Sequence, residues 1–121
     1  MRFAWIMAAI VAAMTSQLNA AQDYSKAYTQ CTNMSYGQQS TLEKCVKKEL
    51  KLQSKVLKKS YKNYVKLNPN NAAIIQNQYV MFEKKVKNQC SRVMAGQQTQ
   101  IKRGECQLEM VIAQTNWYQA R

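Results

Sequence analysis

The stretch CVKKELKLQSKVLKKSYKNYVK, residues 45–66, decides the fold of this chain. It places eight lysines in 22 positions against one acidic residue, Glu49. On a helix, which turns by about 100° per residue, these lysines share one arc, roughly 140° to 260° from Leu42. Apolar residues such as Leu50 and Tyr61 fill the opposite arc, so the stretch predicts a long amphipathic helix with a basic face. We call that face the lysine ridge, and its members are Lys44, Lys47, Lys48, Lys51, Lys55, Lys58, Lys59, Lys62 and Lys66.

Local signals predict where this helix begins and ends. Ser40 and Glu43 stand three residues apart ahead of the apolar pattern, as in a capping box, where each side chain bonds a backbone amide near the other. The helix is therefore expected to begin at Thr41. It is expected to end near Leu67, because Pro69 cannot continue a helix and disfavours helical geometry in the residue before it.

The rest of the chain also predicts helices. It has three glycines and one proline, and its apolar residues recur at spacings of three and four. Helices are expected at about 22–33, from a cap at Asn70 or Asn71 to Gly96, and at about 101–119. The expected fold class is all-α, a small disulfide-stapled bundle of about four helices arranged as two helical hairpins.

The last expected helix is apolar on two sides. One side carries Leu108 and Val111, and the opposite side carries Cys106 and Trp117. Such a helix is either sandwiched within the bundle or exposes one side to a partner. We favour the sandwich because Cys106 must reach another cysteine, while Trp117 near the chain end remains available to a partner.

Four cysteines, Cys31, Cys45, Cys90 and Cys106, predict two disulfides in an exported protein. Zinc is a poor alternative, because the chain has no histidine and no closely spaced cysteine pair. Four cysteines permit three pairings. Each consecutive pair flanks an expected turn between helices, so we expect Cys31 to bond Cys45 and Cys90 to bond Cys106.

The first 20 residues, MRFAWIMAAIVAAMTSQLNA, predict a cleaved secretory signal peptide, because Arg2 precedes an apolar run that ends before small Ala20. That run is shorter than the roughly 20 residues that span a bilayer. Residues 21–121 are then expected to form a single domain. We expect an exported protein that is soluble in the periplasm after cleavage, with its oligomeric state left open.

The lysine ridge has two readings. It is either the solvated face of an ordinary amphipathic helix or a surface for an anionic partner, since a neutral surface helix would intersperse glutamates. The chain's net charge of +12 suits the second reading. Nucleic acid is disfavoured because the ridge lacks arginine and interleaved aromatics, and no membrane insertion is expected. The expected partner-binding residues are Lys47, Lys48, Lys51, Lys55, Lys58, Lys59, Lys62 and Trp117.

No catalytic set is apparent, so we expect a protein that is not an enzyme and that uses no cofactor or metal. Histidine is absent, and the three glycines form no phosphate-binding loop. Glu105 and Glu109 are interpreted as surface charges. Glu49 falls inside the apolar arc, where a carboxylate needs a hydrogen bond or an ion pair to a neighbouring helix.

A set of spaced residues resembles a known family. Gln39, Leu42 and Cys45 stand at the spacing of a glutamine, an apolar residue and a cysteine, and Leu57 and Tyr61 match two positions of an Asp-x-x-Leu-Asn-x-x-Tyr motif. In these residues, and across about 28–114, the chain resembles the lysozyme inhibitor LprI-like family as a divergent member.

The resemblance implies a periplasmic protein that blocks a cell-wall-degrading enzyme. The target would be a lysozyme or, for an immunity protein, a peptidoglycan-targeting effector. Basic inhibitors are steered away from basic lysozymes, so we expect an acidic target. A lysine presented to the paired carboxylates of a glycosidase would neutralise them. The alternatives are an envelope protein that binds anionic polymers, such as lipopolysaccharide or wall phosphates, through the lysine ridge, and a structural or chaperone-like protein that uses the Trp117 side.

Overall fold

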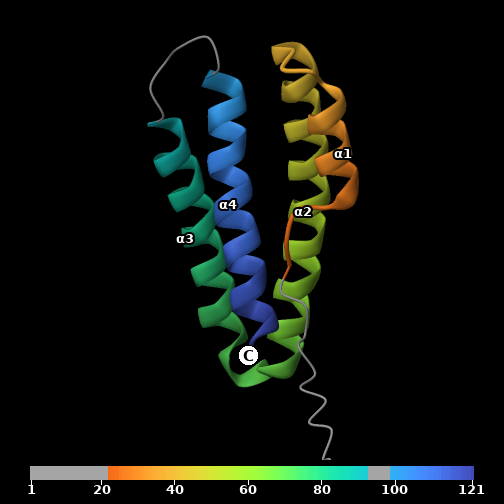
Figure 1. The fold of residues 1–121 in the computed structure, drawn as a ribbon. Helices are drawn as coiled ribbons and strands as arrows, with labels where there is room; N and C mark the ends of the chain where they lie inside the picture. The colour runs from red at the N-terminus through yellow and green to blue at the C-terminus, as the bar shows by residue number, and fades with distance from the viewer. Residues whose placement is uncertain (1–21, 93–98) are drawn as a thin grey trace, which may run out of the picture.

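The computed structural model describes residues 22–92 and 99–121, and within these ranges every regular element is helical. The expected all-α fold is therefore confirmed (Figure 1). The expected signal peptide, residues 1–20, lies outside the described residues. The elements are α1 (Lys26–Met34), α2 (Gln39–Leu67), the 3-10 turn η1 (Pro69–Asn71), α3 (Ala72–Ser91) and α4 (Thr99–Gln119).

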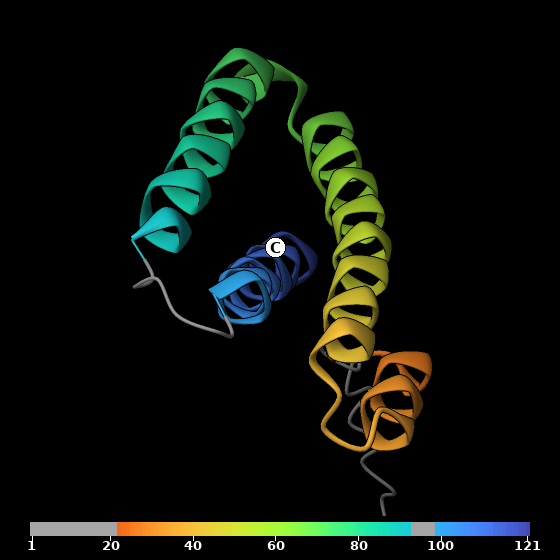
Figure 2. The ribbon, with the colours of Figure 1, turned by 90° about the horizontal axis from the view of Figure 1, so that it is seen from above.

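The long helix α2 is the axis of the bundle. Seen from above, α2 and α3 meet at η1 and diverge from there, and α4 lies between them (Figure 2). The short helix α1 packs on α2, on the side away from α3. No helix in the described part of the chain is both long and apolar enough to cross a membrane.

Two disulfides close the two helical hairpins, as expected. Cys31 on α1 bonds Cys45 on α2, with their Cα atoms 5.7 Å apart. Cys90 on α3 bonds Cys106 on α4, with a Cα separation of 5.5 Å. The loops span 14 and 16 residues, and closing a loop of that size stabilises the folded chain by roughly 3 kcal/mol in the chain-entropy picture.

Helix α4 is sandwiched between α2 and α3, which confirms the interpretation of its two apolar sides. On the α2 side, one core cluster contains Val46, Ile101 and Leu108, and a second contains Leu57, Val111 and Tyr118. On the α3 side, Met110 Sδ lies 3.8 Å from Cys90 Sγ. The backbone of Gly104, also on the α2 side, lies so close to α2 that an added Cβ would overlap Val46 Cγ1.

The predicted start of α2 is wrong by two residues, and so is the capping box. Tyr36 and Gly37 have positive φ angles of 51° and 77°, and they turn the chain so that the extended Gln38 precedes the first helical residue. The first helical bond, from Leu42 N to Gln38 O, is 3.0 Å long. Ser40 therefore lies inside the helix, where its hydroxyl has no cap to make.

The other helix ends differ from expectation for local reasons. Helix α1 begins at Lys26 rather than residue 22, because Ser25 caps it by accepting a hydrogen bond from Tyr28 N. Asn71 precedes α3 as expected, but its side chain makes no cap bond, and η1 leads into that helix. The third helix was expected to run to Gly96, but α3 ends earlier, at Ser91, with Arg92 as its C-cap; Gly96 itself lies outside the described residues.

Candidate functional site

The lysine ridge is exposed along its whole length, as the sequence predicts. Within residues 22–92 and 99–121 one ion pair forms, between Lys47 Nζ and Glu43 Oε1 at 3.7 Å. Both side chains are exposed, and such a pair contributes about 1 kcal/mol or less because water screens it. The ridge therefore presents almost all of its positive charge to solvent.

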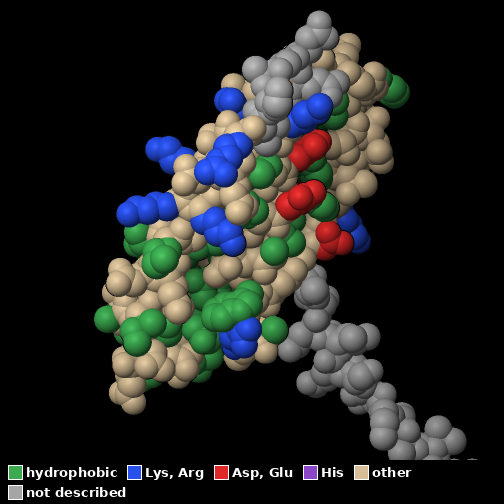
Figure 3. Space-filling view, turned by 90° about the vertical axis from the view of Figure 1, so that its left-hand side faces the viewer, with side chains coloured by type: hydrophobic (Ala, Val, Ile, Leu, Met, Phe, Trp, Pro, Cys, Tyr) green, Lys and Arg blue, Asp and Glu red, His purple; other side chains and the backbone are tan. Residues whose placement is uncertain are grey.

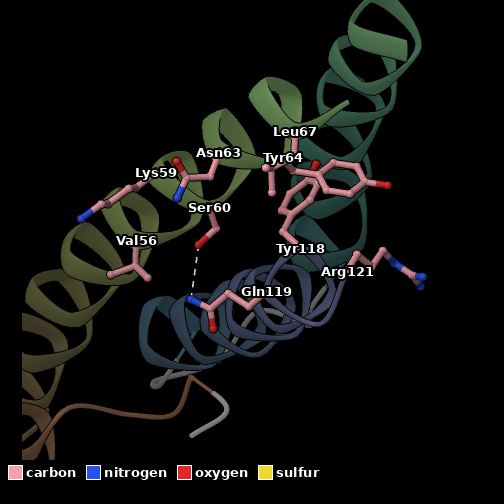
Figure 4. Close-up of a pocket in the computed structure, with 9 residues that line it drawn as sticks. All are labelled: Val56, Lys59, Ser60, Asn63, Tyr64, Leu67, Tyr118, Gln119 and Arg121. Carbon is pink, nitrogen blue, oxygen red and sulfur yellow. Dashed lines mark hydrogen bonds between the residues drawn. The ribbon is translucent and has the colours of Figure 1, made fainter. Parts of the chain in front are cut away.

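A pocket of about 630 Å³ lies where the ridge helix meets the end of α4. Figure 4 shows Lys59, a member of the ridge, extending outward on one side and Arg121 on the other. Between them, Gln119 Nε2 donates a 3.3 Å hydrogen bond to Ser60 Oγ and bridges the two helices. The pocket thus joins two cations to several neutral donors and acceptors.

Sequence reasoning selected Lys59 and missed the other polar residues of the pocket. Asn63 and Gln119 are uncharged polar residues on helices that are mostly read by their apolar spacing. Arg121 lies beyond the last helical turn, so no periodic signal reaches it. Only the packing of α4 against α2 brings these side chains together.

Aromatic rings form the wall next to the pocket. Tyr64 lies edge-on to Trp117, with ring centroids 5.5 Å apart, and Tyr118 is 5.4 Å from Tyr64. Arg121 Cζ lies 4.0 Å from the centre of the Trp117 ring, which is a cation–π distance. Trp117 remains 38% exposed whereas Tyr118 is 5% exposed. The structure therefore leaves Trp117 partly accessible, as expected, and also places it beside the pocket.

Burial affects two tyrosines of this aromatic end. It raises the pKa of Tyr118 above its usual range, and it raises the pKa of Tyr79 with help from the negative charge of Glu83. Tyr79 stacks on Tyr61 with centroids 4.1 Å apart. Both hydroxyls therefore keep their protons in more alkaline solution than a solvent-exposed tyrosine would.

The acidic residue of the ridge helix has a structural role. Glu49 is 2% exposed, and its carboxylate accepts hydrogen bonds from Ser25 N at 2.7 Å and Ser25 Oγ at 2.8 Å. This confirms the expected bond to a neighbouring helix. Because Ser25 is the N-cap of α1, the carboxylate also sits at the positive end of that helix.

Side-chain amides hold the segment that precedes α1. Asn116 accepts from Gln22 N at 2.6 Å and donates to Gln22 O at 3.0 Å, as a strand neighbour would. The fully buried Gln53 donates to Asp23 O at 3.0 Å. These bonds fix the segment across α2 and α4, and sequence spacing gave no sign of them.

The distribution of charge differs between faces. The face that carries α3 shows acidic side chains in a row, basic ones beside them, and hydrophobic ones gathered toward the α2–α3 turn (Figure 3). Glu105 and Glu109 on α4 are exposed, as expected.

Within the part of the chain that the structure describes, no group of three or more potential ligand residues is placed to hold a metal ion.

No family model, curated protein or solved structure matches this chain. The resemblance to the LprI-like family therefore stays a prediction from the spaced residues.

Proposed function

We propose that this protein is a periplasmic inhibitor that binds an acidic, cell-wall-degrading enzyme, as an immunity protein against a peptidoglycan-targeting effector. The observation that carries the proposal is the lysine ridge, which is exposed on one helix face and has a single weak ion pair among the described residues. Unneutralised charge of one sign steers an oppositely charged partner and repels partners of the same sign.

The rigid scaffold supports an inhibitory role. Two disulfides and the packing of α4 between α2 and α3 hold the ridge helix in place. A surface that is ordered before binding loses little conformational entropy on association. Glycosidases cleave with a pair of carboxyl groups, and a lysine from the ridge would neutralise that pair.

The pocket supplies the second part of the contact. Its aromatic wall suits an apolar group of the partner, and its neutral amides suit a polar, uncharged group. Lys59 belongs both to the pocket and to the lysine ridge. Aromatic residues and arginine are common anchors at protein interfaces. Trp117, with Arg121 stacked on it, is the expected anchor beside this pocket.

The direct test is inhibition of purified muramidases and peptidoglycan amidases acting on labelled cell-wall sacculi, in oxidising buffer. We expect the wild-type chain to inhibit an acidic member of this panel. The triple charge reversal Lys51→Glu, Lys55→Glu and Lys58→Glu should raise the inhibitory concentration at least tenfold. The same reversal of Lys84, Lys85 and Lys87 on α3 changes the net charge equally and should leave inhibition intact. Equal losses in the two triple variants would mean that net charge, and not the ridge, matters.

Binding of anionic polymers is the second candidate, because an even row of lysines on one helix face suits a repeating anion. The two candidates differ in their salt dependence and in their partner. Binding to lipopolysaccharide micelles that disappears at high salt, with no enzyme of the panel inhibited, would favour the polymer. It would contradict the inhibitor.

A further inference from the structure

The turn between α1 and α2 exposes two large side chains. Residues 34–38, MSYGQ, form this hairpin tip, in which Met34 is 72% exposed and Tyr36 is 90% exposed. Tyr36 has a φ of 51° and Gly37 a φ of 77°. The tip is therefore a convex element with an aromatic side chain standing free of the bundle.

Several contacts make the tip rigid. Ser35 is 2% exposed, and its hydroxyl donates to Thr32 O at 2.6 Å while it lies within 3.4 Å of Gly37 N. Gln38 N donates to Ser35 O at 3.0 Å. The disulfide between Cys31 and Cys45 closes the hairpin behind the tip. The conformation of the tip is thus set before any partner arrives.

Tyr36 does not stabilise the fold, and another residue at this position would suit the turn better. With nine tenths of its surface in water, it buries almost no apolar area. A positive φ is unfavourable for a residue with a Cβ, and turns of this kind prefer asparagine followed by glycine. An exposed tyrosine in a disfavoured backbone conformation points to a role outside the fold.

We propose that the hairpin tip, with Tyr36 as its anchor, inserts into the substrate cleft of the enzyme that this protein inhibits. This inference rests on the proposed function and deepens it. A convex, rigid tip needs a concave partner, and an aromatic ring occupies the kind of subsite that binds a sugar ring. Rigid tyrosines are frequent anchors because few rotatable bonds must be fixed.

The charge beside the tip suits the same cleft. Lys44, Lys47 and Lys48 are the first members of the lysine ridge after the tip, and all three are exposed. At about 1.5 Å per residue, Lys48 lies roughly 13 Å along α2 from its first residue, Gln39. These lysines therefore reach the rim of a cleft that Tyr36 enters, where catalytic carboxylates make the potential negative.

The test compares Tyr36→Asn with the wild type and with Met81→Gln, a control for an exposed apolar side chain on α3. We measure inhibition of the muramidase panel on labelled sacculi, with and without tri-N-acetylchitotriose, and the thermal midpoint of each variant. We expect chitotriose to relieve inhibition by the wild type. Tyr36→Asn should weaken inhibition at least tenfold while its thermal midpoint stays equal or rises by a few degrees, because asparagine tolerates the positive φ. Met81→Gln should inhibit as the wild type does.

The outcomes separate this inference from the proposed function. If Tyr36→Asn inhibits as well as the wild type, the tip is not an anchor of the complex and the inference is overturned, although the inhibitor proposal stands. Inhibition that chitotriose does not relieve places the tip outside the cleft and overturns the inference. If the wild-type chain inhibits no enzyme of the panel, the proposed function fails, and the inference fails with it.

Discussion

Replacing Gly104 with alanine tests how closely α2 and α4 approach. Gly104 is buried on α4, and the added methyl group would overlap Cγ1 of Val46, which is 3% exposed in the core cluster with Ile101 and Leu108. Valine in a helix has one strongly preferred rotamer, so Cγ1 cannot turn away at low cost. The two helices must separate instead, and the cluster loses contact.

The expected magnitude follows from two opposing effects. Overpacking of this kind costs roughly 1–3 kcal/mol, whereas alanine is better than glycine inside a helix by about 1 kcal/mol. The net effect of Gly104→Ala should be a loss of up to about 2 kcal/mol in the free energy of unfolding. For a domain of about 100 residues, a loss of about 2 kcal/mol lowers the thermal midpoint by roughly 8–16 °C.

The assay is urea unfolding of the oxidised chain, followed by circular dichroism, in a double-mutant cycle with Val46→Ala. Val46→Ala removes the clashing methyl group and itself costs roughly 1–3 kcal/mol. In that background Gly104→Ala should become stabilising by about 1 kcal/mol, because only the helix preference remains. A Gly104→Ala effect that is the same in both backgrounds, or stabilising in the wild type, would refute the close approach.

Three further changes probe other contacts. Because burial raises the pKa of Tyr118, the folded state keeps this proton at pH values where the unfolded state loses it. The free energy of unfolding should therefore fall as pH rises above about 10. In thermal midpoints measured from pH 8 to 11, Tyr118→Phe should make this fall less steep. Glu49→Gln should cost about 1–3 kcal/mol in urea unfolding, because it removes the negative charge at the N-terminus of α1 and leaves only one oxygen to accept from Ser25 N and Ser25 Oγ. An unchanged midpoint would contradict this capping role. Asn116→Asp loses the donor to Gln22 O and should speed hydrogen exchange at the Ser25 amide, with little change at Leu57.

The lysine ridge illustrates what could be predicted from the sequence. Helical spacing alone placed all its lysines on one exposed face, because α2 is long and its apolar arc is continuous. The disulfide pairing also followed from order along the chain, since Cys31 and Cys45, like Cys90 and Cys106, flank turns. Local periodicity was sufficient in both cases.

Features that depend on packing between helices were out of reach. Glu49 was expected to bond a neighbouring helix, but only the folded chain identifies Ser25 as its partner. The capping box at Ser40 was wrong because the positive φ of Tyr36 and Gly37 moved the helix start. Gly104 gave no sequence signal, since a helical glycine reveals its purpose only when a second helix lies against it.

The placement of the two disulfides has a consequence for assembly. Each disulfide joins neighbours along the chain, so the molecule consists of two covalently closed hairpins, α1–α2 and α3–α4, linked only through Asn68 and η1. The core between α2 and α4 is therefore an interface between hairpins that no covalent bond crosses. Two chains could exchange their α3–α4 hairpins by opening this one connection, with every disulfide kept intact. We expect such a dimer to form at high concentration in oxidising buffer, without reduction of any disulfide. Substitutions at Pro69 should change the fraction of the protein that is dimeric.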